Sequence, residues 1–239
     1  MSYVEKKGNI FNSNAMAVVN TVNCVGAMGK GIALDFKLRY PEMFKEYQKI
    51  CFRRMLKPGQ ILPYTKTKPI ILNFAIKDDW KDPSKVEWIE ETLQKFVENY
   101  HHMGLTSVAF PWMGAMNGGL PFETIQNLTR KYLSNLSDID IEVYEFDPNE
   151  PCELYMSLEK IVKENLFSLT ELEQMSLIKT RYWEKIFSAV NDGKVQSINN
   201  LCHYVVNGKR IIGKTNIERL FAFLTRYKKG DFKYSSSLF

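Results

Sequence analysis

The 239-residue sequence contains little cysteine and histidine. Its four cysteines form no CxxC pair, which argues against structural zinc and disulfides and favours a reducing compartment. Two of the three histidines, His101 and His102, are adjacent and point to different sides of whatever element carries them. A metal site or a histidine-based catalytic triad is therefore not expected, and we expect no cofactor.

Long hydrophobic runs are also lacking. The opening MSYVEKKGNIFNSN has no apolar segment of the kind found in signal peptides, and no stretch reaches the about 18 apolar residues of a membrane span. We therefore expect a cytoplasmic protein with no membrane partner. The net charge of +5 permits a polyanionic partner such as nucleic acid without requiring one.

The first 147 residues alternate between two kinds of hydrophobic pattern. Short, nearly continuous apolar runs predict strands at 16–20, 70–76, 107–112 and 139–146. A 3.6-residue period predicts helices at 31–40, 42–52, 84–103 and 122–136, the third starting from Asp82 and Pro83 as N-cap and first turn. This alternation predicts a three-layer α/β domain with a largely parallel or mixed central sheet.

A polar, proline-containing break, DPNEPCE, begins at residue 147. Beyond it the sequence predicts helices at 154–166, 169–190 and 217–227, and a hairpin turn at Asn207-Gly208. We therefore divide the chain into an α/β domain, residues 1–147, and a mostly helical region, residues 148–239, of unknown role. That region could bind a toxin, bind DNA through basic and aromatic segments (TRYWEK, RYKKGDFKY), or cover an apolar face of the first domain.

Two glycine-rich turns each follow an apolar strand and open a helix. The first is VNTVNCVGAMGKGIALDF, residues 19–36, and the second is FPWMGAMNGGLPFETI, residues 110–125. Backbone N–H groups at such turns favour anions, and two turns at neighbouring strand ends can hold a diphosphate. The alternative is that each glycine only makes a tight turn.

The first turn fits neither of two common phosphate-binding motifs. A P-loop requires glycine at position 24 and Ser or Thr at position 31, where the chain has Cys24 and Gly31. A dinucleotide fingerprint beginning at Gly29 requires a small residue at position 34, which is Leu34. The sequence thus supports neither a P-loop ATPase nor a Rossmann dehydrogenase.

Five segments carry a resemblance to a known family. They are KGNIF, AVVNTVNCVGAMGKGIALDFKLRYPEMFKEY, ILNFAIKDDWK, the second glycine-rich turn and IEVYEF. In order and spacing, residues 1–147 resemble the macrodomain family, which binds ADP-ribose. They most resemble its DarG-type branch, antitoxins that remove ADP-ribose from thymidine bases in DNA after a DarT toxin attaches it.

The resemblance implies a set of ADP-ribose-binding residues. Asn9 stands where family members usually have an aspartate that accepts the adenine amino hydrogen; an asparagine oxygen can also accept it, without the charge. Tyr144 or Phe146, at the end of the last strand, could contact the adenine face or have only a packing or edge role. The complete predicted set is Asn9, Ile10, Asn20, Asn23, Val25, Met28, Gly29, Lys30, Gly31, Ile32, Pro111, Gly114, Ala115, Met116, Asn117, Gly118, Gly119, Leu120 and Tyr144.

The resemblance also implies a catalytic pair, Lys77 and Asn23. Lys77 follows the strand LNFAI, where lysine-dependent macrodomains place the amine that acts at the anomeric carbon. Such an amine needs a lowered pKa, whereas a solvated lysine beside Asp78 and Asp79 would keep its charge. Asn23 would orient the ribose hydroxyls or a water.

The resemblance favours an ADP-ribosyl hydrolase that acts on DNA, as an antitoxin or a counter-defence protein. The second loop, GAMNGGL, lacks the acid of relatives that act on protein glutamate. Lys30, Trp80, Lys81 and Lys85 could meet a DNA strand, and a DarT-like toxin could be a partner of a monomeric protein. The alternatives are a non-catalytic ADP-ribose-binding module, or a hydrolase of ADP-ribosylated protein or of small ADP-ribose derivatives.

Overall fold

The computed structural model describes residues 2–232 and divides into two compact units. The N-terminal unit ends at Phe146 and the C-terminal unit begins at Asp147, one residue before the boundary set from the sequence. None of the helices within residues 2–232 has the length and apolar character needed to cross a membrane.

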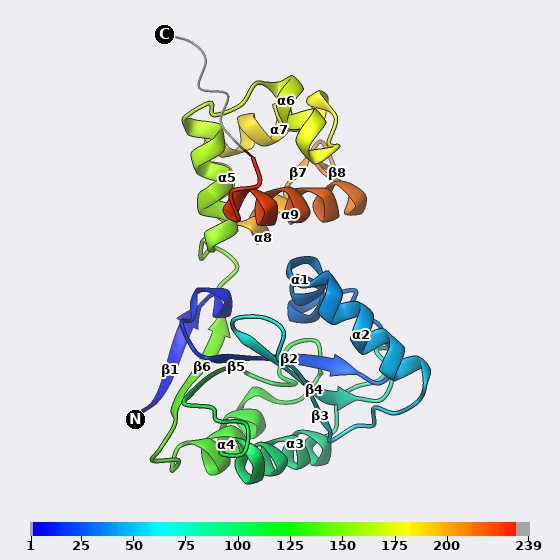
Figure 1. The fold of residues 1–239 in the computed structure, drawn as a ribbon, viewed down its shortest axis with the longest axis vertical. Coiled ribbons are helices and arrows are strands. Elements are labelled where there is room, and N and C mark those ends of the chain that lie inside the picture. The colour runs from blue at the N-terminus through cyan, green and yellow to red at the C-terminus, as the bar shows by residue number, and fades with distance from the viewer. Residues whose placement is uncertain (1, 233–239) are drawn as a thin grey trace. The chain divides into compact units, whose positions relative to one another are not determined.

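The N-terminal unit is built on a six-stranded mixed sheet (Figure 1). The strand order is β1-β6-β5-β2-β4-β3, and every neighbouring pair is parallel except β3 with β4. The predicted α/β class with a mixed central sheet is confirmed. The strands are β1 Tyr3–Gly8, β2 Ala17–Asn23, β3 Ile61–Tyr64, β4 Ile70–Lys77, β5 Ser107–Pro111 and β6 Asp140–Phe146, with a short 3₁₀ helix, Ile10–Asn12, after β1.

Two pairs of helices cover the two faces of this sheet. Figure 1 shows α1 (Gly31–Arg39) and α2 (Pro41–Phe52) on one side, and α3 (Val86–Asn99) and α4 (Phe122–Leu133) on the other. Because consecutive strand residues point to opposite faces, Val18 packs in the core beneath α1 and α2, and Val19 packs in the core against α3 and α4. Both faces are buried, which explains the nearly continuous hydrophobic runs in the central strands.

The structure differs from the sequence prediction at two edge strands of the sheet and at the start of one helix. Strands β1 and β3 were not predicted from the sequence, because β1 is mostly polar and exposed and β3 has four residues including a proline. The expected start of α3 at Asp82 and Pro83 is wrong, since the helix begins at Val86. The backbone N–H of Ser84 instead donates to the carbonyl of Gly118 at 2.9 Å, which holds this segment outside the helix.

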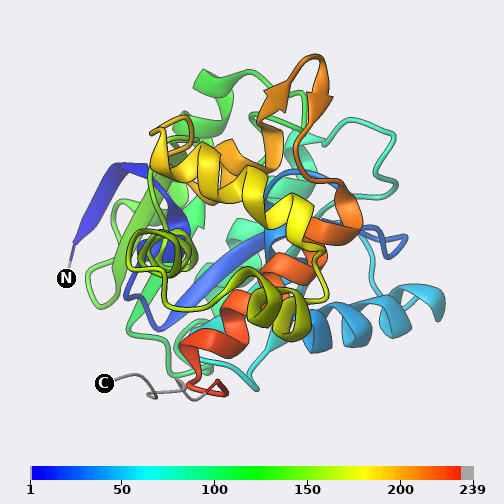
Figure 2. The ribbon, with the colours of Figure 1, turned by 90° about the horizontal axis from the view of Figure 1, so that it is seen from above.

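The C-terminal unit is mostly helical, with one small hairpin (Figure 2). The rings of Trp183 and Phe223 pack edge to face with centroids 5.6 Å apart and join two helices through its core. Its elements are α5 Glu153–Lys163, α6 Leu169–Ser176, α7 Thr180–Asn191, α8 Ile198–His203, β7 Val205–Val206, β8 Lys209–Arg210 and α9 Lys214–Lys228.

Two local features of the C-terminal unit test the sequence predictions. The hairpin turn at Asn207-Gly208 is confirmed, with φ values of 50° and 74°. The single helix expected over residues 169–190 is wrong, because Leu177 adopts a left-handed conformation with φ 61° and ends α6. The segment RYKKGDFKY extends past residue 232, and its last two residues lie outside the described part of the chain.

Candidate active site

The first glycine-rich turn is held in shape by the side chain of Asn23. This residue ends β2 and is only 6% exposed. Its Oδ1 accepts the backbone N–H groups of Val25 at 3.1 Å and Ala27 at 3.2 Å, and its Nδ2 donates to the Ala27 carbonyl at 2.6 Å. Tyr47 of α2 donates its hydroxyl to the Asn23 carbonyl at 2.7 Å. The Asn23 amide therefore organises the loop, and its predicted catalytic role stays a prediction.

The start of α1 lies directly against the second loop. Gly31 has a φ of +59°, and a Cβ atom there would lie 2.4 Å from the Asn117 amide nitrogen. Only glycine allows this approach together with this backbone conformation. The N-cap residue, Lys30, makes no side-chain cap, so it leaves the first N–H groups of the helix available to an anion.

The second glycine-rich turn folds back tightly on itself. A Cβ atom on Gly118 would lie 2.3 Å from the carbonyl oxygen of Gly114, so the loop closes only with glycine at this position. The Leu120 N–H donates to the same carbonyl at 3.1 Å. Together with the Ser84 hydrogen bond to Gly118, these contacts fix the loop at the edge of the sheet.

Lys77 ends β4 at the point where the two loops meet. Its Nζ donates to the carbonyl of Asn117 at 2.7 Å, on the residue whose side chain approaches Gly31. Partial burial lowers the pKa of Lys77, while the nearby Asp82 carboxylate acts in the opposite direction. The acid that opposes the shift is thus Asp82 rather than Asp78 or Asp79.

The nearby thiol is a poor alternative nucleophile. Burial raises the pKa of Cys24 to about 12, so its thiolate is scarce at neutral pH. Within residues 2–232, no cluster of three or more His, Cys, Asp or Glu side chains is arranged to hold a metal ion. Lys77 therefore stays the predicted reactive group at this edge of the sheet.

Several predicted ligand residues have structural partners of their own. Asn20 is fully buried in the sheet and donates to Asn73 Oδ1 at 2.8 Å. Asn9 caps the 3₁₀ helix by accepting the Phe11 N–H at 3.1 Å. Tyr144 is buried in the same core as Ile10 and donates to the Glu142 carboxylate at 2.8 Å.

The other predicted ligand residues lie in or near the two loops after β2 and β5, and they differ in exposure. Met28, Gly114 and Gly118 are buried, and Ile32, Pro111, Ala115 and Leu120 are partly buried. The exposed members are Val25, Gly29, Lys30, Gly31, Met116, Asn117 and Gly119.

The segment between β4 and α3 carries three of the four residues predicted to meet DNA, and the fourth, Lys30, is the N-cap of α1. Trp80 is 57% exposed, and the Lys81 ammonium lies 5.6 Å from its ring centroid. The Lys85 ammonium instead lies over Trp88 at 4.7 Å. The backbone N–H of Cys24 donates to the Asp78 carbonyl at 2.9 Å, so this segment is bonded to the first loop.

Comparisons with known proteins agree with this geometry. Residues 19–129 match the Macro domain family model. Over 143 residues the chain is 38% identical to the DNA ADP-ribosyl glycohydrolase of Thermus aquaticus, an alignment that covers 58% of this chain and 40% of the relative. The macrodomain of Mycobacterium tuberculosis DarG superposes with a TM-score of 0.57 at 38% identity, covering 59% of this chain and 96% of that one.

A further relative joins two activities in one chain. The DNA ADP-ribosyl transferase-DNA ADP-ribosyl glycohydrolase fusion protein of Thermosipho africanus is 30% identical over 163 residues, which are 60% of this chain and 41% of the relative. The structure of Thermosipho africanus DarTG in complex with ADP-ribose has a TM-score of 0.58 at 29% identity, covering 61% of this chain and 42% of that one.

The sheet, the two loops and these likenesses define the class: the chain belongs to the macrodomain family. It is similar to DNA ADP-ribosyl glycohydrolases and to the macrodomain of DarG, which confirms the branch expected from the sequence. The chain spans about 40% of the length of the curated relatives that it matches.

Proposed function

We propose that the N-terminal unit is a hydrolase that removes ADP-ribose from bases in DNA. The observation that carries this proposal is the position of Lys77, whose Nζ lies where the two glycine-rich loops meet and whose pKa is lowered by burial. The proposal is supported by relatives whose names state this activity and by one relative structure in complex with ADP-ribose.

The two loops supply backbone donors for a diphosphate. The uncapped start of α1 leaves its first N–H groups available to an anion, and the second loop approaches Gly31 at that helix start. A diphosphate held between them would extend the distal ribose toward Lys77, the one lysine that ends a strand between these loops. Binding would thus come mainly from the main chain, and chemistry from the amine.

Cleavage of the N-glycosidic bond passes through an oxocarbenium-like state. In the net reaction, the bond between the anomeric carbon and the base nitrogen breaks, while water supplies a hydroxyl to the carbon and a proton to the base. A neutral amine can attack or position water at that carbon, whereas an ammonium would repel the developing positive charge. A lowered pKa of Lys77 increases the neutral fraction.

One observation favours a second candidate, a module that binds ADP-ribose without cleaving it. The Lys77 ammonium donates a 2.7 Å hydrogen bond to the Asn117 carbonyl, and such a bond stabilises the charged form of the amine. If that bond persisted with ligand present, Lys77 would hold the second loop in place and take no part in chemistry.

We further propose a role as an antitoxin or counter-defence protein that acts as a monomer in the cytoplasm. The fusion of a transferase with a glycohydrolase in Thermosipho africanus supports a functional link to a DNA ADP-ribosyl transferase, the class of toxin expected as a partner. Small-angle scattering of the intact chain alone and with such a transferase tests both the monomer and the partner.

The experiment compares ADP-ribose release from thymidine-modified DNA by the wild type, Lys77→Ala and Lys95→Ala. Lys95 is a matched control because its Nζ also donates to a backbone carbonyl, that of Gly59, at 2.6 Å. We expect Lys77→Ala to lose about 10²-fold or more in rate, the usual contribution of a positioned acid or base, and Lys95→Ala to retain activity.

The alternative outcomes are distinct. Equal rates for the wild type and Lys77→Ala would remove Lys77 from the mechanism. No release by the wild type, together with ADP-ribose binding by calorimetry, would establish the binding module and refute the hydrolase.

A further inference from the structure

Four consecutive exposed residues begin at the last residue of α2. They are Phe52, Arg53, Arg54 and Met55, which we call the rim patch. Phe52 is 77% exposed and Met55 is 62% exposed, so two large apolar side chains lie in water beside two guanidinium groups. The surrounding segment, residues 47–59, also contains two lysines and no Asp or Glu. The patch is therefore both apolar and positively charged.

The backbone of the rim patch is fixed rather than loose. The Met55 N–H donates to the Ile50 carbonyl at 3.1 Å and the Arg54 N–H donates to the Cys51 carbonyl at 2.8 Å. This pair of bonds is the Schellman ending of a helix, whose left-handed residue is usually glycine. Here that residue is Arg54, with φ 54°. A side chain in this conformation costs stability, so the fold itself would be served better by glycine at this position.

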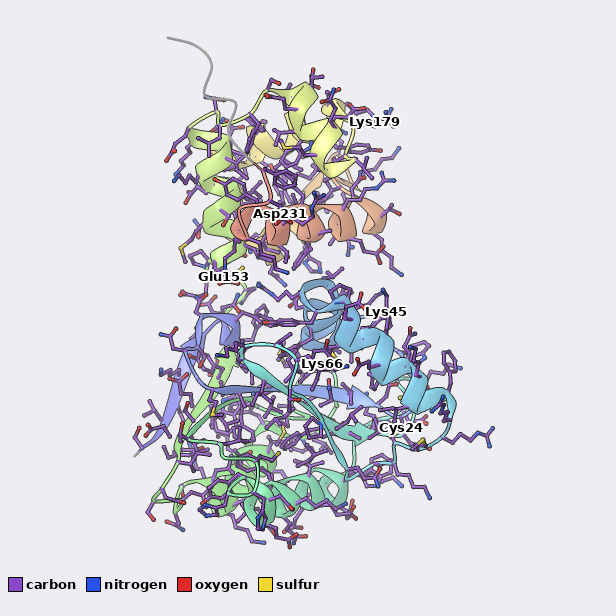
Figure 3. The ribbon with its side chains drawn as sticks, in the orientation of Figure 1. Cys24, Lys45, Lys66, Glu153, Lys179 and Asp231 are labelled. Carbon is purple, nitrogen blue, oxygen red and sulfur yellow. The ribbon has the colours of Figure 1, made fainter. Side chains whose placement is uncertain are left out.

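The rim patch lies beside the first glycine-rich loop. A Cβ atom on Gly26 of that loop would lie 3.4 Å from the Cys51 Cβ atom, and Gln48 of α2 donates to the Gly26 carbonyl at 3.2 Å. In Figure 1 the end of α2 lies at the edge of the sheet to which β2 runs, and Figure 3 labels Cys24 at this edge.

The chain that leaves the rim patch also returns to the strand of Lys77. The Gly59 N–H donates to the Ala75 carbonyl at 2.8 Å, and the Ala75 N–H donates to the Gln60 carbonyl at 2.9 Å. Ala75 lies two residues before Lys77 on β4. The segment that follows the patch is thus bonded through its backbone to the strand that carries the proposed reactive amine.

The two arginines have no acidic partner within residues 2–232. Neither Arg53 nor Arg54 forms an ion pair there. By contrast, two lysines of the same unit, Lys45 and Lys66, pair with glutamates. Unpaired cations of one sign beside an exposed aromatic ring are typical of surfaces that bind single-stranded nucleic acid through phosphates and base stacking.

We propose that the rim patch binds the single-stranded DNA that carries the modified base, with Arg53 and Arg54 on phosphates and Phe52 stacked on an unpaired base. This inference rests on the proposed function, because it places the DNA beyond the ADP-ribose at the same edge of the sheet. Phe, Met and Arg are also enriched in protein interfaces. DNA is favoured since the charges are of one sign and the substrate itself brings a polyanion to this edge.

The test measures binding of an unmodified, fluorescein-labelled single strand of about 12 nucleotides to the intact chain by anisotropy, between about 50 and 200 mM salt. The key variant is Arg54→Gly, which removes one charge and gives the left-handed position its preferred residue. Lys68→Gln is the matched control, because Lys68 is exposed and lies two residues before the start of β4, at the strand end opposite Lys77.

We expect Arg54→Gly to bind the strand more weakly and to lower the slope of log K against log salt by about 0.7, the value for one phosphate contact on a single strand. Its thermal midpoint should equal or exceed that of the wild type, which separates lost binding from lost folding. Phe52→Ala should weaken binding by about 5-fold or more with no change in slope. Lys68→Gln should match the wild type.

Two results would overturn the proposal. One is an affinity and a salt slope of Arg54→Gly that equal those of Lys68→Gln. The other is unchanged DNA binding by the patch variants together with weaker capture of a purified DNA ADP-ribosyl transferase, which would assign the patch to a protein partner. The anisotropy assay requires no catalysis, so failure of ADP-ribose release from modified DNA would refute the proposed function separately.

Discussion

Replacing Asn23 with alanine tests whether this residue builds the first loop or takes part in chemistry. The Asn23 side chain makes three hydrogen bonds to the backbone of the loop, at 2.6, 3.1 and 3.2 Å, and is almost completely buried. Alanine removes all three bonds and leaves two N–H groups and one carbonyl without these partners. The Tyr47 hydroxyl loses its 3.1 Å contact with Asn23 Oδ1 but keeps its 2.7 Å bond to the Asn23 carbonyl, which belongs to the main chain.

The expected loss of stability follows from this count. Each bond contributes about 1 kcal/mol net, and three give about 3 kcal/mol. Val25 is exposed, so water can replace one partner and reduce the loss to about 2 kcal/mol. Because the loop that Asn23 shapes is the one expected to hold a phosphate, the affinity for ADP-ribose should fall along with the free energy of unfolding.

The assays are urea denaturation of the intact chain and calorimetric titration with ADP-ribose. Asn99→Ala is the control, because Asn99 is exposed and makes one side-chain bond, to the Lys95 carbonyl at 2.8 Å. It should lose less than about 0.5 kcal/mol. If Asn23→Ala kept its stability and its ADP-ribose affinity but lost turnover, the structural reasoning would be refuted and Asn23 would be catalytic.

Two further predictions concern Lys77 and Leu177. If neutral Lys77 is the active form, the rate of ADP-ribose release should rise with pH and level off below the usual lysine pKa of about 10.5, and a steady rise past that value would contradict the burial effect. Between the lowered pKa of Lys77 in the folded state and its usual pKa in the unfolded state, the folded state binds fewer protons. The contribution of Lys77 to stability should therefore increase with pH in that window. In urea denaturation, Lys77→Met should abolish this increase. Leu177→Gly should raise the thermal midpoint, because the exposed Leu177 has a φ of 61° and glycine relieves a cost of about 1 kcal/mol; a lower midpoint would show that this side chain has packing of its own.

The parts of the fold that could be predicted from the sequence are those buried on both faces. Strands β2, β4 and β5 read as continuous apolar runs because helices cover each side of the sheet. The edge strands β1 and β3 lack that signal, since a strand with one partner and solvent beside it can be polar or contain proline. Sequence periodicity reports burial, so it misses strands whose burial is slight.

The sequence predicted the glycines of the candidate site but not the contacts between its side chains. The glycines of both loops were visible because backbone conformation and close approach restrict the residue type, as at Gly31 and Gly118. The contacts of Tyr47 with Asn23 and of Lys77 with Asn117 were not, because they join residues 24 and 40 positions apart. The left-handed Arg54 gave no sequence signal, since glycine is the residue that marks such a position.

In the proposed site, main-chain groups bind the nucleotide, so side chains must determine which substrate is accepted. Under the proposed function the uncapped start of α1 offers backbone N–H groups to a diphosphate, while the Asn23 side chain is used to shape the loop before it. A site of this kind recognises the nucleotide whatever is attached to its distal ribose. Discrimination among DNA, protein and small-molecule adducts must then come from residues around it. Near the site the structure has an exposed tryptophan after Lys77 and, after α2, two arginines without an ion-pair partner among residues 2–232. Exchanging those side chains, rather than the glycines, should alter the substrate without altering affinity for ADP-ribose itself.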